Sequence, residues 1–347
     1  MKKFVVSSMV LAASTAAVHA QSYLTISGSV YGGLGFNSGG AALRTALAGT
    51  SSLMISGKED MGGGLSALLK LENGFNADTG TTASSTFFDK QAFLGLQGTW
   101  GTLRMGRLYT PSFATLALVG DPTATYGVFT ATNLMESHAV RLNNGIIYNS
   151  PGFNPWTYGR NGFYGALAHY FGESATGGAS QNSATGFNLG YGNSALTLEI
   201  SHHQGNTYTN ATLDVDAKST IFAANYKWAK ARFFFAYSDN TARNVITQAK
   251  TKDNTDFLLG ISYPLGSGVL SASYIRKNNQ LLPENDAYQI GAMYEHYLSK
   301  RSKVTLGFAK IHNRNPARPH RVSNGYAGTT AATAGTGAVT LGLTHRF

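Results

Sequence analysis

Hydrophobic and polar residues alternate with period two through most of the chain. In the segment 22–36 the apolar residues share one parity, and they are Leu24, Ile26, Val30, Leu34 and Phe36. Small and polar residues take the other parity. Because successive side chains of a strand point to opposite faces, this pattern predicts strands with one apolar and one polar face.

The same alternation recurs in about sixteen segments. We expect strands at 22–36, 50–59, 64–76, 87–98, 101–109, 140–150, 162–172, 184–192, 195–203, 218–228, 231–239, 255–264, 268–277, 286–297, 302–312 and 337–347. An even number of amphipathic strands is typical of single-chain bacterial barrels in the outer membrane.

Connections between these segments alternate between short and long. Short ones lie at 60–64, 98–101, 192–195, 228–231, 264–268 and 298–301, and 150–161 is longer than a turn requires. Long ones lie near 37–49, 77–86, 110–139, 173–183, 204–217, 240–254, 278–285 and 313–336. Short periplasmic turns and long extracellular loops are the plan of an all-β, antiparallel transmembrane barrel.

The first twenty residues predict an export signal. Lys2 and Lys3 precede the short apolar stretch 4–18, and Val18-His19-Ala20 suits cleavage, so the barrel would occupy 21–347. No other segment has eighteen uninterrupted apolar residues, which excludes helical membrane spans. An exported barrel of this kind belongs in the cell outer membrane.

Composition and charge agree with a barrel. Charged residues make up only 13% of the chain, against 41 Gly, 18 Tyr and 19 Phe, and there is no Cys. The two lysines of the export signal account for two of the ten net positive charges, leaving +8. Export and the lack of a basic run argue against nucleic acid as a partner. Aromatic residues near strand ends predict two membrane-interface girdles, from Trp100, Tyr109, Tyr148, Tyr158, Tyr191, Trp228, Tyr263 and Tyr297.

Several motifs resemble the trimeric sixteen-stranded general-diffusion porins of Gram-negative bacteria, in their betaproteobacterial branch. The resemblance covers essentially the whole mature chain. The segments that carry it are 21–28 (QSYLTISG), 57–65 (GKEDMGGGL), 93–96 (FLGL), 101–107 (GTLRMGR), 148–151 (YNSP), 297–301 (YLSKR) and 344–347 (THRF). It implies a water-filled channel for small hydrophilic solutes and ions.

The resemblance also implies that the loop 110–139 folds into the pore against the barrel wall. Its apolar residues suit that position, because an exposed loop gains nothing from them: Leu116, Leu118, Val119, Val128 and Phe129. Asp121 and Glu136 would bring carboxylates to the constriction.

Facing this loop, the family carries a ladder of basic side chains that selects ions by sign. Its motif falls on Arg107 and Arg141, and Lys90 occupies a further basic position. Strict alternation puts Arg107 and Lys90 on the lipid face, so Arg107 requires a bulge near Gly106. Lys90 has the same parity problem and would lie at the mouth of the pore rather than in its throat.

Two further lysines, Lys58 and Lys70, fall on the lumen parity. They would line the constriction, lie near the periplasmic vestibule, or pair with Glu72. Ser52 departs from the family, which usually has Arg there, and this loss weakens the basic wall and widens the throat. With a charge of +8 and two acids in the loop, we expect weak to moderate anion selectivity.

Partners follow from the resemblance. It implies a homotrimer joined through the first and last strands, contact with outer-membrane lipid and lipopolysaccharide, and recognition of the terminal Phe347 by the barrel-assembly machinery. The strand that ends at Phe347 must also pair with the first strand, since an open edge cannot persist in lipid. No cofactor or metal site is expected.

Other functions fit less well. Adjacent His202 and His203 point to opposite faces and cannot form one catalytic dyad, and no hydrolase motif is present. A substrate-specific channel for a sugar, phosphate or organic acid is the main alternative, with Tyr109, Phe113 and Tyr126 as a fragment of an aromatic track. A structural or adhesive barrel would more readily have a plugged lumen.

Overall fold

The computed structural model describes residues 22–39, 41–45, 51–153, 161–172, 182–210, 212–317, 319–322 and 335–347. The predicted export signal lies outside these residues, as do Tyr158 and parts of the connections 37–49, 150–161, 173–183 and 313–336. No helix among the described residues is long and apolar enough to cross a membrane.

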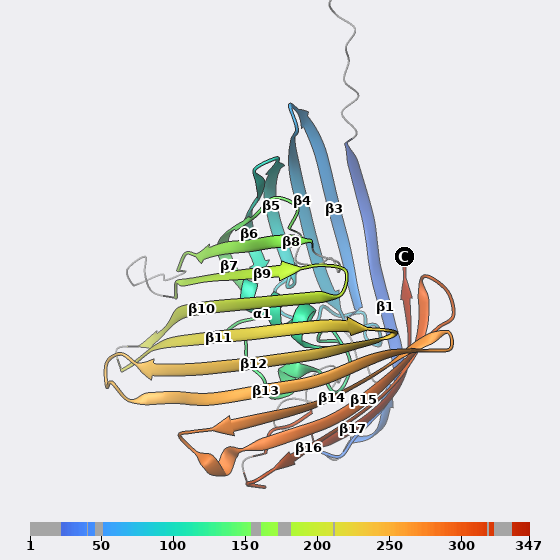
Figure 1. Ribbon diagram of the computed structural model, residues 1–347, viewed down its shortest axis with the longest axis vertical. Coiled ribbons are helices and arrows are strands. Elements are labelled where there is room, and N and C mark those ends of the chain that lie inside the picture. Colours follow the sequence, from blue (N-terminus) through green and yellow to red (C-terminus); the bar gives the residue numbers. More distant parts are fainter. Residues whose placement is uncertain are drawn as a thin grey trace, which may run out of the picture.

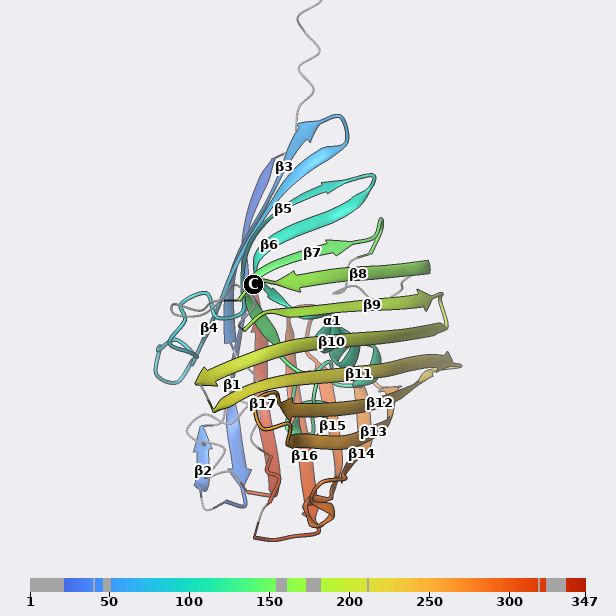
Figure 2. The same cartoon turned by 90° about the vertical axis from the view of Figure 1, so that its left-hand side faces the viewer.

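Sixteen strands of the described chain form one closed antiparallel ring, as the alternation predicts (Figures 1 and 2). They are β1 (Tyr23–Asn37), β3 (Ser51–Gly62), β4 (Leu65–Phe75), β5 (Gln91–Gly98), β6 (Gly101–Tyr109), β7 (Arg141–Asn149), β8 (Gly162–Tyr170), β9 (Ala184–Gly192), β10 (Leu196–Asn210), β11 (Leu213–Trp228), β12 (Ala231–Asn244), β13 (Lys250–Leu265), β14 (Gly268–Asn279), β15 (Ala287–Tyr297), β16 (Ser302–Asn313) and β17 (Gly337–Arg346). A short strand, β2 (Ala41–Thr45), pairs with the end of β1.

The first strand closes the barrel. Its first half pairs with β3, from Tyr23 to Ser29, and its second half pairs with β17, from Ser29 to Asn37. Just beyond β17 the backbones of Gly28 and Phe347 exchange two hydrogen bonds of 3.1 Å. The ring therefore has no free edge there, which is the condition for a sheet in lipid.

Burial follows the predicted alternation. On β12 the side chains of Phe234 and Ala236 are buried inside the ring, whereas Phe233 and Tyr237 are exposed on its outer face. The exposed apolar side chains continue around the barrel and form a surface suited to lipid. An antiparallel sheet with one apolar face requires this pattern.

The prediction of a long loop is wrong for two segments. Most of 204–217 belongs to β10 and β11, and 240–254 is largely strand because β12 and β13 reach Asn244 and Lys250. These segments carry polar residues on both faces, so they lack the alternation of a lipid-facing strand. Backbone pairing continues there all the same, for instance between Asn206 and Asp216.

Aromatic side chains mark the short-turn end of the barrel. Trp100, Trp228, Tyr263 and Tyr297 are all exposed there, as a membrane-interface girdle requires. Tyr109 is not part of a girdle. Its ring stacks on Phe113, at 5.4 Å between ring centroids, on the inner side of the wall.

Candidate pore constriction

The loop between β6 and β7 folds back inside the ring, as predicted. It begins with helix α1 (Pro111–Thr115), which continues as a π-helical turn (Leu116–Gly120), and a 3-10 turn follows at Ala131–Asn133. The Thr110 side chain caps the helix by accepting a 3.2 Å hydrogen bond from the Phe113 amide, and Pro111 suits the first helical position. In Figures 1 and 2, α1 lies inside the barrel beside β10 and β11.

Apolar side chains hold this loop against the wall. Leu116, Val119, Val128 and Phe129 are completely buried in a cluster with inward residues of β11 to β17. Gly291 on β15 makes this approach possible, because a Cβ there would collide with Phe129. Each such side chain contributes roughly 1.5–3 kcal/mol by burial. The loop is thus part of the barrel's interior.

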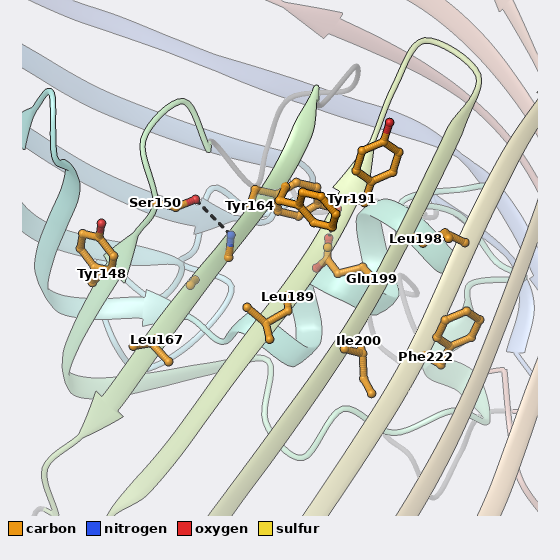
Figure 3. A pocket seen from close by; sticks show the side chains of 14 residues that line it. Tyr148, Ser150, Tyr164, Leu167, Leu189, Tyr191, Leu198, Glu199, Ile200 and Phe222 are labelled. Carbon is orange, nitrogen blue, oxygen red and sulfur yellow. Dashed lines mark hydrogen bonds between the residues drawn. The ribbon is translucent and has the colours of Figure 1, made fainter.

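A buried carboxylate joins α1 to the wall. Glu199, on β10, accepts hydrogen bonds from the Thr115 hydroxyl (2.6 Å), the Asn188 amide (2.7 Å) and the Tyr164 hydroxyl (2.6 Å). Figure 3 shows Glu199 and Tyr164 together on the side of the wall that faces α1. The wall glycine Gly190 leaves room for the Tyr164 ring. This arrangement fixes the first turn of the loop.

Asp121 acts within the loop. Its carboxylate accepts hydrogen bonds from the Thr123 amide (2.8 Å) and hydroxyl (2.7 Å), the Ala131 amide (2.7 Å) and the Thr130 hydroxyl (3.3 Å). Burial raises the pKa of Asp121, against the lowering effect of these hydrogen bonds. The structure therefore places this predicted constriction acid at the centre of the loop's own fold, where it braces two segments.

Glu136 ties the far end of the loop to the wall. It pairs with Lys252 and, at 3.2 Å, with Lys277, whose ammonium also lies 3.3 Å from Asp256. Burial acts to raise the pKa of Glu136, but the two lysines outweigh it and hold the pKa low. Both predicted loop acids are thus engaged by protein groups.

Elsewhere on the wall, two lysines lie beside one acid. Glu72 lies 3.5 Å from Lys70 and 3.9 Å from Lys90. Burial lowers the pKa of Lys90 and Glu72 opposes this effect; the charge of Arg141 lowers the pKa further, and Asp89 acts to raise it. Lys90 precedes β5, so the parity rule that put it on the lipid face does not apply to it.

Arg141 occupies the start of β7, where the loop ends. Its guanidinium carbon lies 4.6 Å from the centroid of the Tyr109 ring, and it donates a 3.1 Å hydrogen bond to the Tyr109 hydroxyl. Stacking over an aromatic ring leaves the guanidinium its charge and fixes its direction. Lys70, Lys90, Arg141 and Glu72 are hereafter the basic cluster.

Two predicted basic residues lie elsewhere. The strand register shifts after Gly106, as predicted, but Arg107 pairs with Ala92 on the parity of the outward Leu94 and Met105. Its guanidinium donates to the Asp89 carbonyl at 2.7 Å and to the Asn143 side chain. Arg107 therefore braces the wall at Asp89, the residue that precedes Lys90.

Lys58 lies toward the short-turn end of β3. Its ammonium donates a 3.0 Å hydrogen bond to the Gln97 side chain on β5. Its position at the short-turn end keeps the vestibule location as a prediction.

Arg104 is an inward basic residue that the family motif did not single out. It pairs across the sheet with Gly95 and Ile147 on the inner face, and donates a 2.8 Å hydrogen bond to Asn149. Its guanidinium carbon lies 5.5 Å from the Phe93 ring centroid. Strict alternation on β6 already assigns it to the lumen, so parity alone was enough to find it.

An open space remains between the loop and the wall. A cavity of about 370 Å³ lies between the loop tip at Tyr126 and Gly127 and the wall residues Ser52, Met54 and Glu72. Ser52 lines this cavity at the position where the family usually has Arg. The charged residues that line this cavity are Glu72, Glu295, Lys303 and Arg346. The open space thus borders the basic cluster at Glu72.

Comparisons with known proteins agree with this architecture. The sequence profile of the Gram-negative porin family matches residues 7–316. Outer membrane porin protein 32 of Delftia acidovorans is 28% identical over 372 residues, covering all of both chains. An outer membrane porin protein of Bordetella pertussis is 26% identical over 269 residues, covering 70% of each chain.

Solved structures share the fold. The anion-selective porin from Comamonas acidovorans superimposes with a TM-score of 0.81 at 24% identity, covering 94% of this chain and all of that one. OmpT of Vibrio cholerae in its trimer form superimposes with a TM-score of 0.65 at 12% identity, covering 94% of this chain and 99% of that one.

Proposed function

The chain belongs to the Gram-negative porin family, and we propose that it forms a water-filled channel with a weak to moderate preference for anions. Small hydrophilic solutes and ions would cross the outer membrane through it by passive diffusion. Such a channel needs no catalytic group, and we propose no enzymatic activity.

The observation that carries the anion preference is the group of basic side chains along β4, β7 and the residue before β5. Lys70 and Lys90 both lie beside one carboxylate, Glu72, and Arg141 lies over the Tyr109 ring, whereas Glu136 is already paired with wall lysines. A passing anion therefore meets an excess of positive charge at the constriction. Rings of charged side chains at a narrow point select permeant ions in this way.

Liposome swelling tests the channel itself. Purified protein in liposomes should admit neutral sugars at rates that fall with sugar size. Ser52→Trp should slow the larger sugars selectively, because Ser52 lines the open space. Leu53→Trp is the matched control, since Leu53 is the next residue and faces outward. Absence of swelling with the wild-type protein, or equal slowing by both variants, would contradict a pore at this position.

A substrate-specific channel is the second candidate. Tyr109 and Phe113 stack beside Arg141, and Tyr126 at the loop tip is 57% exposed. Phe113 is buried and Tyr109 is half-buried, so Tyr126 is the ring of these three that a solute with an apolar face could contact directly. Saturable block of the ion current by one organic anion, without a similar effect of others of its size, would favour this function.

We also propose that the chain assembles as a homotrimer through the outer faces of its first and last strands. Gly32 on β1 has open space on its outer side, which permits close approach, whereas the Phe347 ring occupies the space over Gly28. Outer-membrane lipid and lipopolysaccharide would cover the remaining outer face. The barrel-assembly machinery would recognise Phe347. Crosslinking of detergent-solubilised protein should yield a trimer band that Gly32→Trp removes.

A further inference from the structure

Two adjacent histidines on β10 lie in opposite environments. His202 faces outward, and its Nδ1 is 2.9 Å from the Thr220 hydroxyl. His203 faces inward and is completely buried. Their opposite orientations agree with the parity of the strand. His202, on the outer face, is therefore a suitable control position for substitutions of the inward His203.

The inward ring stacks on a second histidine from the constriction loop. The ring centroids of His203 and His138 are 4.4 Å apart, with an angle of 37° between the planes. Within the described residues, none of the four ring nitrogens has a hydrogen-bond partner of good geometry. A buried polar group without such a partner is costly, and a charge at the same place costs more.

Among the described residues, no unpaired carboxylate lies next to the two histidines to compensate the positive charge of a protonated ring. Tyr170 on β8 lies 5.9 Å from His203 between ring centroids, and β9 presents the backbone at Gly186. Near His138 the charged groups are Lys252 on β13 and Glu136, which are paired with each other. Burial lowers the pKa of His138 and Lys252 adds to this, against the opposing effects of the Gly205 backbone and Glu136.

The location of His138 connects this pair to the pore. Two residues before it, Glu136 is tied to the wall, and three residues after it, Arg141 joins the basic cluster. His138 itself has a left-handed backbone, with φ of 65°. Gly205 on β10 accommodates its ring, because a Cβ there would lie 2.7 Å from Cε1. A shift of His138 would therefore move the segment that leads into Arg141.

We propose that His138 and His203 form an acid-sensitive latch, which holds the end of the constriction loop against β10 at neutral pH and releases it in acid. The role of this latch in conduction rests on the proposed pore. In the docked state both imidazoles are neutral and in contact. In the released state they reach water and take up protons freely.

The sign of the pH dependence follows from this difference. A released histidine has an ordinary pKa of about 6.5, so the released state binds more protons below that pH. The docked state is favoured above pH 6.5, and the fraction of docked protein decreases as the pH falls below that value. Between pH 7.5 and 5 the ratio of docked to released protein changes by up to about 30-fold for each histidine.

A spin label on the loop tests this latch without relying on conduction. The chain has no cysteine, so Ala139→Cys provides a single labelling site beside His138. We expect the label to become more mobile as the pH falls from 7.5 to 5. His203→Phe keeps a ring of similar size but cannot be protonated, and should reduce the change, because only His138 then takes up a proton on release. His202→Phe, on the outer face, should leave the change intact.

Gly205→Ala provides a second route to the released state. Its Cβ would press on the His138 ring, so the label should be mobile already at pH 7.5. An unchanged label in the wild-type protein between pH 7.5 and 5, or loss of the change in His202→Phe, would overturn the latch. Lack of ion current at every pH would overturn the pore instead, because the label response decides the latch independently.

Discussion

Lys277 provides the sharpest test of how the loop is held. Its side chain is 5% exposed, and its ammonium lies 3.0 Å from the Leu134 carbonyl, 3.2 Å from Glu136 and 3.3 Å from Asp256. Lys277→Met removes the charge and keeps most of the apolar stem. The loop then loses one charged hydrogen bond and one of the two lysines that hold Glu136.

The magnitude follows from these contacts. A hydrogen bond from a charged donor contributes roughly 1.5–3 kcal/mol. In this variant Glu136 keeps its ion pair with Lys252. The repulsion between Glu136 and the buried Asp256 is no longer offset by the Lys277 ammonium. We expect loop docking to weaken by about 3 kcal/mol, which is roughly a hundredfold change in the docked-to-released ratio.

Single-channel recording at neutral pH measures this change. Lys277→Met should raise the open-channel noise and produce brief conductance steps as the loop leaves the wall. Lys303→Met is the control, because Lys303 forms a similar ion pair with Glu295 on β15 and β16. A quiet current in Lys277→Met, or equal noise in both variants, would refute the anchoring role of Lys277.

Three further changes test the pore and its closure. Arg141→Gln should lower the chloride-to-potassium permeability ratio by about fivefold, since one charge in contact with an ion is worth about 1 kcal/mol in water, and adding Lys90→Gln should lower the ratio further; an unchanged ratio in the double variant would exclude both residues from the ion path. Ser52→Arg should reduce conductance and raise anion preference, and a larger conductance would contradict its position on the open space. Gly28→Val should impair barrel assembly, because a side chain there collides with the Phe347 ring, whereas heat-modifiable migration on gels like that of the wild type would show that this contact is dispensable.

The strand plan could be predicted from the sequence because lipid on one side and water on the other impose a strict alternation. This signal fails where both faces are wet. The pattern therefore predicts loops at the ends of β10 to β13, although backbone hydrogen bonds continue through them. Strand boundaries in such regions depend on cross-strand pairing, which a single sequence does not reveal.

The constriction was only partly predictable. Parity assigned Lys70 to the lumen, but parity does not apply to Lys90, which lies just before β5 and is buried with its ammonium 3.9 Å from Glu72. The role of Glu136 depends on partners up to 141 residues away, such as Lys277, and that of Asp121 depends on how the loop folds back on itself to bring Thr123, Thr130 and Ala131 around it. Loop composition indicated that the loop packs inside, but it carried no information about which acids remain available to the pore.

The contact between His138 and His203 could not be predicted from the sequence either. His203 was assigned correctly to the face opposite His202. Its contact with His138 depends on the path of the long loop 110–139, which periodicity does not describe. Short-range patterns fix the direction of a side chain, and only the tertiary fold brings two such side chains together.

The most direct measurement of the central claim is the zero-current potential across a tenfold KCl gradient in a planar bilayer. A perfectly selective channel would give about 59 mV in magnitude at 25 °C. We expect a smaller value with the sign of chloride preference, and a value near zero when Lys70, Lys90 and Arg141 are all replaced by Gln. A potential with the sign of potassium preference in the wild-type protein would contradict a constriction governed by its basic cluster.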